Sequence, residues 1–194
     1  MRRHLVVSTG TLIAVMVLLS ACGSSSKSSG PSGSDTSTPA SANALTCTGL
    51  TANLNVTPPV SPTVSETHKV NVTGKLSGCT GTPGITSGDL TLEVNVSDKL
   101  NCAQLISYSK PNRAVLSVTW NDGTASTGSG FLVTFQDVTK FLISGRVTAG
   151  ASFVGKTATA QTVNTPEGGG CISGGASLGV ATLAFAPGTE LEIG

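Results

Sequence analysis

The stretch Asp89-Leu90-Thr91-Leu92-Glu93-Val94-Asn95-Val96-Ser97 decides the fold class, because apolar and polar side chains alternate along it without a break. Such alternation places every second side chain on one face of an extended strand, so one face is buried and the other meets water. The same period of two runs through residues 50–57 and 69–73. We therefore expect an all-β domain.

Further strands are expected along the rest of the chain, with proline and glycine turns between them. They cover residues 114–120, 131–136, 141–147, 158–163 and 177–185. Only residues 97–106 look helical, with Ser97 or Asp98 as the cap and Leu100, Leu105 and Ile106 as buried residues. Seven to nine strands predict an antiparallel β-sandwich, with a small closed β-barrel as the alternative.

The N-terminus is typical of an export signal. Arg2 and Arg3 form a positive start, residues 5–19 are an apolar run, and Ser20-Ala21 are the small residues that precede cleavage. The sequence Leu19-Ser20-Ala21-Cys22 resembles the lipobox of bacterial lipoproteins. The resemblance implies that Cys22 carries a diacylglyceryl group, that its freed amine is acylated, and that the protein is anchored on the extracytoplasmic side of the cell membrane. A transmembrane anchor is the alternative, but residues 5–21 are at the short limit for a spanning helix.

The chain divides into three parts. Residues 1–21 are the signal peptide, residues 22–43 are the lipidated cysteine and a tether rich in Ser, Gly, Pro and Thr, and residues 44–194 are a single β domain. The tether has no large apolar side chains that would offset the entropy of ordering it. A flexible chain of this length spans roughly 25 Å, enough to hold the domain clear of the head groups.

Charged residues make up only 11% of the chain, against about 25% in a typical soluble domain. After cleavage nine basic and ten acidic side chains remain, a formal net charge of −1. Nucleic acid is not an expected partner, because nothing would neutralise its phosphates. A surface of hydroxyls and amides suits binding of an envelope protein, a glycan or a lipid.

Four cysteines remain besides Cys22: Cys47, Cys79, Cys102 and Cys171. An even number in an exported chain predicts two disulfides, for which three pairings are possible. The first two strands should form a hairpin turning at residues 58–62, which brings Cys47 beside Cys79 and leaves Cys102 to pair with Cys171. The four positions are too far apart in the sequence for a typical zinc site.

Two catalytic motifs occur, and neither has the context it requires. Residues 150–157 fit the phosphate-loop pattern G-x-x-x-x-G-K-[ST] with Lys156, but β-favouring residues follow it instead of a helix. Residues 175–179 fit the G-x-S-x-G nucleophile turn with Ser177, but no histidine follows His68 in the chain. We expect both residues to be non-catalytic and residues 150–157 to connect two strands.

The remaining candidates for chemistry are single residues. His68 is the only histidine left after cleavage, and we expect its side chain to be solvated. A triad of His68 with Asp122 would combine isolated residues. Carboxylates for glycoside hydrolysis would have to come from a set that we expect at the solvated surface: Asp89, Glu93, Asp98, Asp122 and Asp137. The sequence predicts no catalytic residue, no cofactor and no metal.

Trp120 ends an alternating strand just before the turn Asn121-Asp122-Gly123. It shares parity with Ala114, Leu116 and Val118, which predicts that it lies in the core. Together with residues 145–155 and the four cysteines, this segment resembles small secreted or lipid-anchored actinobacterial domains that have no assigned activity. The resemblance implies a location and a fold without a catalytic residue.

These patterns together predict a non-enzymatic, lipid-anchored recognition module. Two alternatives stay open. A carrier of an apolar ligand would need a cavity of roughly several hundred Å³, lined by residues such as Phe131, Phe135, Phe141 and Ile143. A hydrolytic enzyme would need a catalytic grouping that no motif in the chain supplies.

Overall fold

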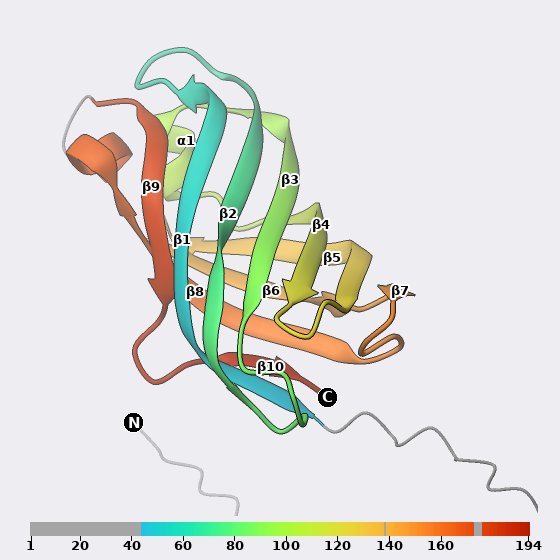
Figure 1. The fold of residues 1–194 in the computed structure, drawn as a ribbon. Coiled ribbons are helices and arrows are strands. Elements are labelled where there is room, and N and C mark those ends of the chain that lie inside the picture. Colours follow the sequence, from blue (N-terminus) through green and yellow to red (C-terminus); the bar gives the residue numbers. More distant parts are fainter. Residues whose placement is uncertain (1–43, 138, 173–175) are drawn as a thin grey trace, which may run out of the picture. The chain divides into compact units, whose positions relative to one another are not determined.

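The computed structural model describes residues 44–137, 139–172 and 176–194. The predicted signal peptide, Cys22 and the tether lie outside the described residues. Strands dominate the domain (Figure 1). The elements are β1 (Leu45–Val60), β2 (Glu66–Thr80), β3 (Gly88–Leu100), α1 (Cys102–Ile106), β4 (Pro111–Trp120), β5 (Ala125–Asp137), β6 (Lys140–Arg146), β7 (Ala149–Gly150), β8 (Thr157–Pro166), the 3₁₀ segment η1 (Glu167–Ile172), β9 (Leu178–Phe185) and β10 (Leu191–Ile193).

Eight strands close into an antiparallel barrel, and two short strands lie outside it. The order runs β1-β2-β3-β4-β5-β6-β8-β9, and β9 pairs again with β1, as in the partners Asn53 and Thr182. The sandwich prediction is therefore not confirmed, whereas the barrel alternative fits. Alternation shows which face of a strand is buried, but it does not show whether the first and last strands of the sheet meet.

The two outer strands extend the barrel wall locally. β10 follows β9 after a turn and lies between β1 and β8, pairing Ile193 with Leu45 on one side and with Ala158 on the other. β7 pairs with the start of β5. β10 therefore lies between β1 and β8, the same two strands that β9 joins farther along the barrel.

The helix begins later than predicted. β3 continues to Leu100, and α1 starts at Cys102 with Asn101 as its N-cap, so Ser97 and Asp98 lie in a strand. The Asn101 side chain accepts a hydrogen bond from the Gln104 N–H at 3.0 Å, and the Gln104 side chain accepts one from the Asn101 N–H at 2.9 Å. This capping box fixes the start of the helix. Among the described residues, no helix is long and apolar enough to span a membrane.

The first hairpin is longer than predicted. β1 passes through Pro58 and Pro59 to Val60, so the turn lies at residues 61–65 instead of 58–62. Cys47 and Cys79 lie inside the two strands, directly opposite each other, and form a disulfide. A second disulfide joins Cys102 at the start of α1 to Cys171 in η1. Both predicted pairings are present.

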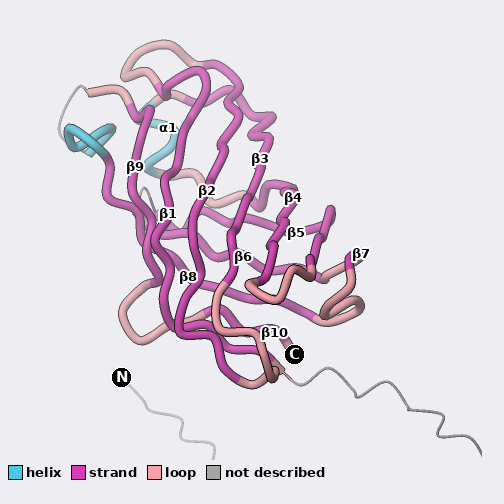
Figure 2. Tube along the Cα trace, viewed as in Figure 1, coloured by secondary structure: helices cyan, strands magenta, loops and turns pink. Residues whose placement is uncertain are grey.

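The two ends of the barrel are built differently. At one end, which we call the capped end, lie the β1–β2 turn and the two helical segments α1 and η1, drawn in cyan in Figure 2. At the other, which we call the loop end, lie the β4–β5 turn and residues 147–156 between β6 and β8. β1 starts at the loop end and finishes at the capped end (Figure 1).

Candidate functional site

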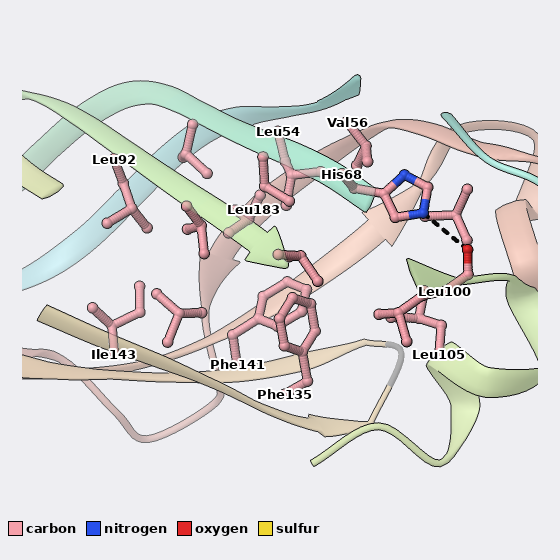
Figure 3. Close-up of a pocket in the computed structure, with 16 residues that line it drawn as sticks. Leu54, Val56, His68, Leu92, Leu100, Leu105, Phe135, Phe141, Ile143 and Leu183 are labelled. Carbon is pink, nitrogen blue, oxygen red and sulfur yellow. Dashed lines mark hydrogen bonds between the residues drawn. The ribbon is translucent and has the colours of Figure 1, made fainter. Parts of the chain in front are cut away.

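The barrel encloses an apolar cavity of about 40 Å³ below the capped end (Figure 3). Its walls are aliphatic and aromatic side chains from β1, β2, β3, β5, β6 and β9, and Leu105 of α1 also lines it. The only polar side chain in the wall belongs to His68. The cavity is far smaller than the several hundred Å³ that a drug-sized ligand occupies.

Three of the four residues predicted to line a carrier's cavity do line this one. Phe135, Phe141 and Ile143 belong to the wall, and the rings of Phe135 and Phe141 meet edge to face with centroids 4.8 Å apart. Phe131 instead lies toward the loop end, beside a second void of only about 10 Å³. The interior is therefore largely filled by the chain's own side chains.

His68 is buried, which corrects the prediction that it is solvated. Only 3% of its surface is exposed. Nδ1 lies 2.8 Å from the carbonyl oxygen of Pro58 in β1. Nε2 lies 3.0 Å from the carbonyl oxygen of Leu100 in β3, the contact that is dashed in Figure 3. Carbonyl oxygens only accept, so both contacts are hydrogen bonds only when both ring nitrogens carry hydrogen. His68 thus ties the ends of β1 and β3 across β2.

Covalent and polar contacts hold α1 over the cavity. Besides the Cys102–Cys171 disulfide, the Cys102 N–H donates to the Ser61 carbonyl at 3.0 Å, and the Ser65 hydroxyl donates to the Gln104 side chain at 2.9 Å. The helix is thereby fastened both to η1 and to the β1–β2 turn. Leu105 is the buried side chain that it directs into the barrel.

A polar cluster fastens the chain that leaves α1. The Tyr108 hydroxyl and the Lys110 ammonium both donate to Asp98 Oδ2 at 3.0 Å. The hydrogen bonds from Lys110 and Tyr108 lower the pKa of the Asp98 carboxyl, since they favour its charged form. Burial, followed by the neighbouring Asp98, raises the pKa of Tyr108. Asp98 is therefore a partner in a structural ion pair.

The loop end is closed by aromatic packing. Trp120 is 2% exposed, which confirms that it lies in the core, and its ring meets that of Phe153 edge to face at 5.6 Å. The indole N–H donates to the Ser126 hydroxyl at 2.9 Å, which donates to the Ser152 carbonyl at 2.8 Å. Phe153 has a φ of 62°, a conformation that non-glycine residues rarely adopt. Residues 147–156 hold Phe153 in that conformation, and its ring packs against Trp120 and closes the barrel at the loop end.

The two sequence motifs are dispersed over the domain. Residues 150–157 connect two strands, as predicted, and Lys156 lies at the loop end beside Phe153, to whose carbonyl its N–H donates at 3.0 Å. Ser177 is exposed just before β9 at the capped end. His68 is engaged with two backbone carbonyls, and Asp122 accepts hydrogen bonds from Thr124 within the β4–β5 turn at the opposite end. The structure does not bring these residues together.

The candidate carboxylates also lie apart. Asp89 pairs with Lys75 on the outside of the barrel, Asp98 belongs to the Tyr108 cluster, and Glu93 is exposed on β3. Hydrogen bonds from the Thr124 and Thr139 side chains lower the pKa of Asp122 and Asp137, respectively. Each of these two carboxylates accepts from a threonine two residues later, which stabilises a turn.

The outer face of the barrel is divided by charge. β2 and β3 carry acidic and basic side chains, whereas the neighbouring strands β8, β9 and β1 contain no charged residue. A row of hydroxyl and amide side chains, which we call the polar belt, crosses seven strands, each member directly opposite the next. Its members are Thr165, Thr182, Asn53, Thr73, Thr91, Ser117 and Thr127.

Comparison with known proteins adds no functional assignment. No family model, no curated protein and no solved structure matches the chain.

Proposed function

We propose that this protein is a lipid-anchored recognition module of the cell envelope, without catalytic activity of its own, which binds its partner on the outside of the barrel. The observation that carries this proposal is the filled interior. The voids below the capped end and at the loop end measure about 40 and 10 Å³. Contacts with a partner of any size therefore fall to the outer surface.

The proposal includes the location of the protein in the cell. The Leu19–Cys22 lipobox pattern supports lipid attachment at Cys22 and a position on the extracytoplasmic side of the membrane. Two disulfides support an oxidising compartment. The tether that precedes Ala44 supports presentation of the domain away from the lipid surface.

The anchor is tested by mass spectrometry of the mature N-terminus. A diacylglyceryl-modified, acylated Cys22 is expected, and the variant Cys22→Ala should lose both modifications and leave the membrane fraction. A mature chain that starts elsewhere and carries no lipid would contradict the anchor.

The recognition function is tested by binding of the purified lipidated protein, in detergent, to envelope fragments of its source cell. Binding should saturate, be displaced by unlabelled protein, and be lost after reduction and unfolding. Binding that never saturates would overturn the proposal.

A carrier of an apolar ligand is the second candidate, because the wall of the 40 Å³ cavity is apolar apart from His68. It would require the capped end to open. Native mass spectrometry that finds a lipid inside the intact protein would favour the carrier over the recognition module, whereas a mass equal to the lipidated chain alone would exclude it.

A further inference from the structure

We propose that the surface beside β10 is a binding site for a neutral saccharide. This inference rests on the proposed recognition function and names its ligand class. Two shallow hollows of about 290 and 360 Å³ flank β10 and share Thr159 of β8 and Glu192 of β10 as lining residues. Together they form one concave region, which we call the β10 hollow, on the seam between β8 and β1.

The lining of the β10 hollow can both donate and accept hydrogen bonds. Thr157 and Thr159 of β8 contribute two hydroxyls, and Gln161 contributes an amide, one N–H of which donates to the Gln136 side chain at 2.6 Å. The Thr189 hydroxyl lies 2.9 Å from the Gln161 carbonyl oxygen and 2.8 Å from that of Ala186, so its one hydrogen is used inside the domain and its oxygen can only accept from a ligand. Alternating donors and acceptors on a rigid strand match the hydroxyls of a sugar, each of which also donates and accepts.

Two carboxylates complete the hollow. Glu190 and Glu192 line it, and neither belongs to the ion pairs formed by the described residues, which are Lys75–Asp89 and Lys110–Asp98. A carboxylate accepts hydrogen bonds from two adjacent hydroxyls, and charge-assisted bonds of this kind are about twice as strong as neutral ones. No lysine or arginine lines the hollow, so an anionic ligand would meet only repulsion.

The surroundings of the hollow favour a chain of sugars over a single ring. The uncharged strands β8, β9 and β1 continue from it toward the capped end. The polar belt crosses these strands at Thr165, Thr182 and Asn53. On β9, the exposed side chains of Val180 and Ala184 lie on either side of Thr182. Hydroxyls beside small apolar side chains suit the mixed polar and C–H surface of a neutral polysaccharide.

The test is native electrophoresis of the full lipidated protein, in nonionic detergent, through gels that contain dextran, mannan or galactan, with heparin as an anionic comparison. At least one neutral polysaccharide should retard the protein, and heparin should not. The double variant Glu192→Gln/Thr159→Val should weaken retardation by about tenfold or more, the size expected for loss of a charge-assisted hydrogen bond. The matched variant Glu93→Gln/Thr119→Val, at exposed positions of β3 and β4 outside the polar belt and the hollow, should change it by less than about twofold, as for ordinary surface substitutions.

Each other result overturns the inference. If no neutral polysaccharide retards the protein while envelope fragments still bind it, the saccharide site is wrong and the recognition function stands. If neither a neutral polysaccharide nor the envelope fragments bind the protein, the saccharide site and the recognition function are both wrong. Equal effects of the two double variants, at unchanged melting temperature, would place the site elsewhere. Loss of retardation on adding EDTA would mean that a bound cation, rather than the side chains, recognises the ligand.

Discussion

The capped end and the loop end of the barrel close the same interior by different physical means. At the loop end, Trp120, Phe131 and Phe153 fill the space almost completely, leaving a void of about 10 Å³. At the capped end a helix of only five residues covers a larger void of about 40 Å³, and it is held by a disulfide and hydrogen bonds. Packing secures one end and cross-linking the other, so the two should respond to different perturbations.

The largest effect is expected from Trp120→Ala at the loop end. It removes a fully buried indole from a tightly packed site, and the free energy of unfolding should fall by about 3–5 kcal/mol. Urea unfolding measures the loss. Leu105→Ala at the capped end should cost less, about 2–3 kcal/mol, because its neighbours already face a void. If Leu105→Ala costs more than Trp120→Ala, the assignment of tight packing to the loop end is wrong.

Removal of the Cys102–Cys171 disulfide should act mainly on the capped end. The double variant Cys102→Ala/Cys171→Ala should lower stability by about 2–4 kcal/mol, chiefly because the unfolded chain gains freedom. Hydrogen exchange of the α1 and η1 amides should accelerate by more than the loss of global stability requires, whereas exchange of the amides around Trp120 should accelerate only by that loss. Equal acceleration at both ends would contradict a local role of this bond.

His68→Leu tests the polar contacts of the capped end. Leucine fits the apolar wall but offers no donor to the Pro58 and Leu100 carbonyls, so a loss of about 1–3 kcal/mol is expected. His68→Gln keeps an amide donor and should lose less. Thermal melts of the two variants at one pH give the comparison, and an unchanged or raised melting temperature for His68→Leu would show that the polar contacts of the His68 ring contribute nothing net.

Added methylene groups should distinguish the two voids directly. Val72 lines the cavity at the capped end, and Val118 lines the void at the loop end. Val72→Ile should leave stability within about 0.5 kcal/mol or raise it slightly, since there is room for the group. Val118→Ile should cost about 1 kcal/mol or more through overpacking. Chemical denaturation of both variants ranks them, and the reverse order would refute the contrast.

The smallest effect concerns acid. The pKa of Asp98 at the capped end is lowered by Lys110 and Tyr108, and that of Asp122 at the loop end by Thr124. A carboxyl with a lowered folded-state pKa stabilises the protein above its unfolded pKa of about 3.9, and this contribution disappears as the pH falls through the folded value. The melting temperature should therefore drop as the pH falls below about 4. In Lys110→Met the drop in melting temperature should be shallower. An identical pH profile would show that the Asp98–Lys110 pair contributes nothing to stability.

Sequence patterns predicted the parts of this fold that depend on neighbouring residues. Parity placed Trp120 in the core, and hairpin geometry paired Cys47 with Cys79. The same parity argument applies to His68, which shares its face with Val70 and Val72, yet its charged neighbours favoured a solvated interpretation. Barrel closure could not be predicted, because it depends on the pairing of β1 with β9, which are more than a hundred residues apart. Phe153 was missed since no pattern foretells a buried ring at positive φ.

The β10 hollow had no signal in the sequence. Glu190 and Glu192 follow a Pro187-Gly188 turn near the end of the chain, where they resemble any solvated tail. Only the placement of β10 between β1 and β8 brings them against Thr157 and Thr159. Sites made by strands distant in the chain need the register of the sheet, which local alternation leaves undetermined.

The Cys47–Cys79 bond also has a mechanical consequence. A force applied to the chain that precedes Ala44 would enter the domain there and begin to peel β1 away from β2 and β10. Cys47 lies only two residues into β1, so the peeling front meets a covalent bond almost at once, and the load passes to β2 through Cys79. With the lipid anchor that we propose at Cys22, a pull toward the membrane would therefore leave the barrel closed.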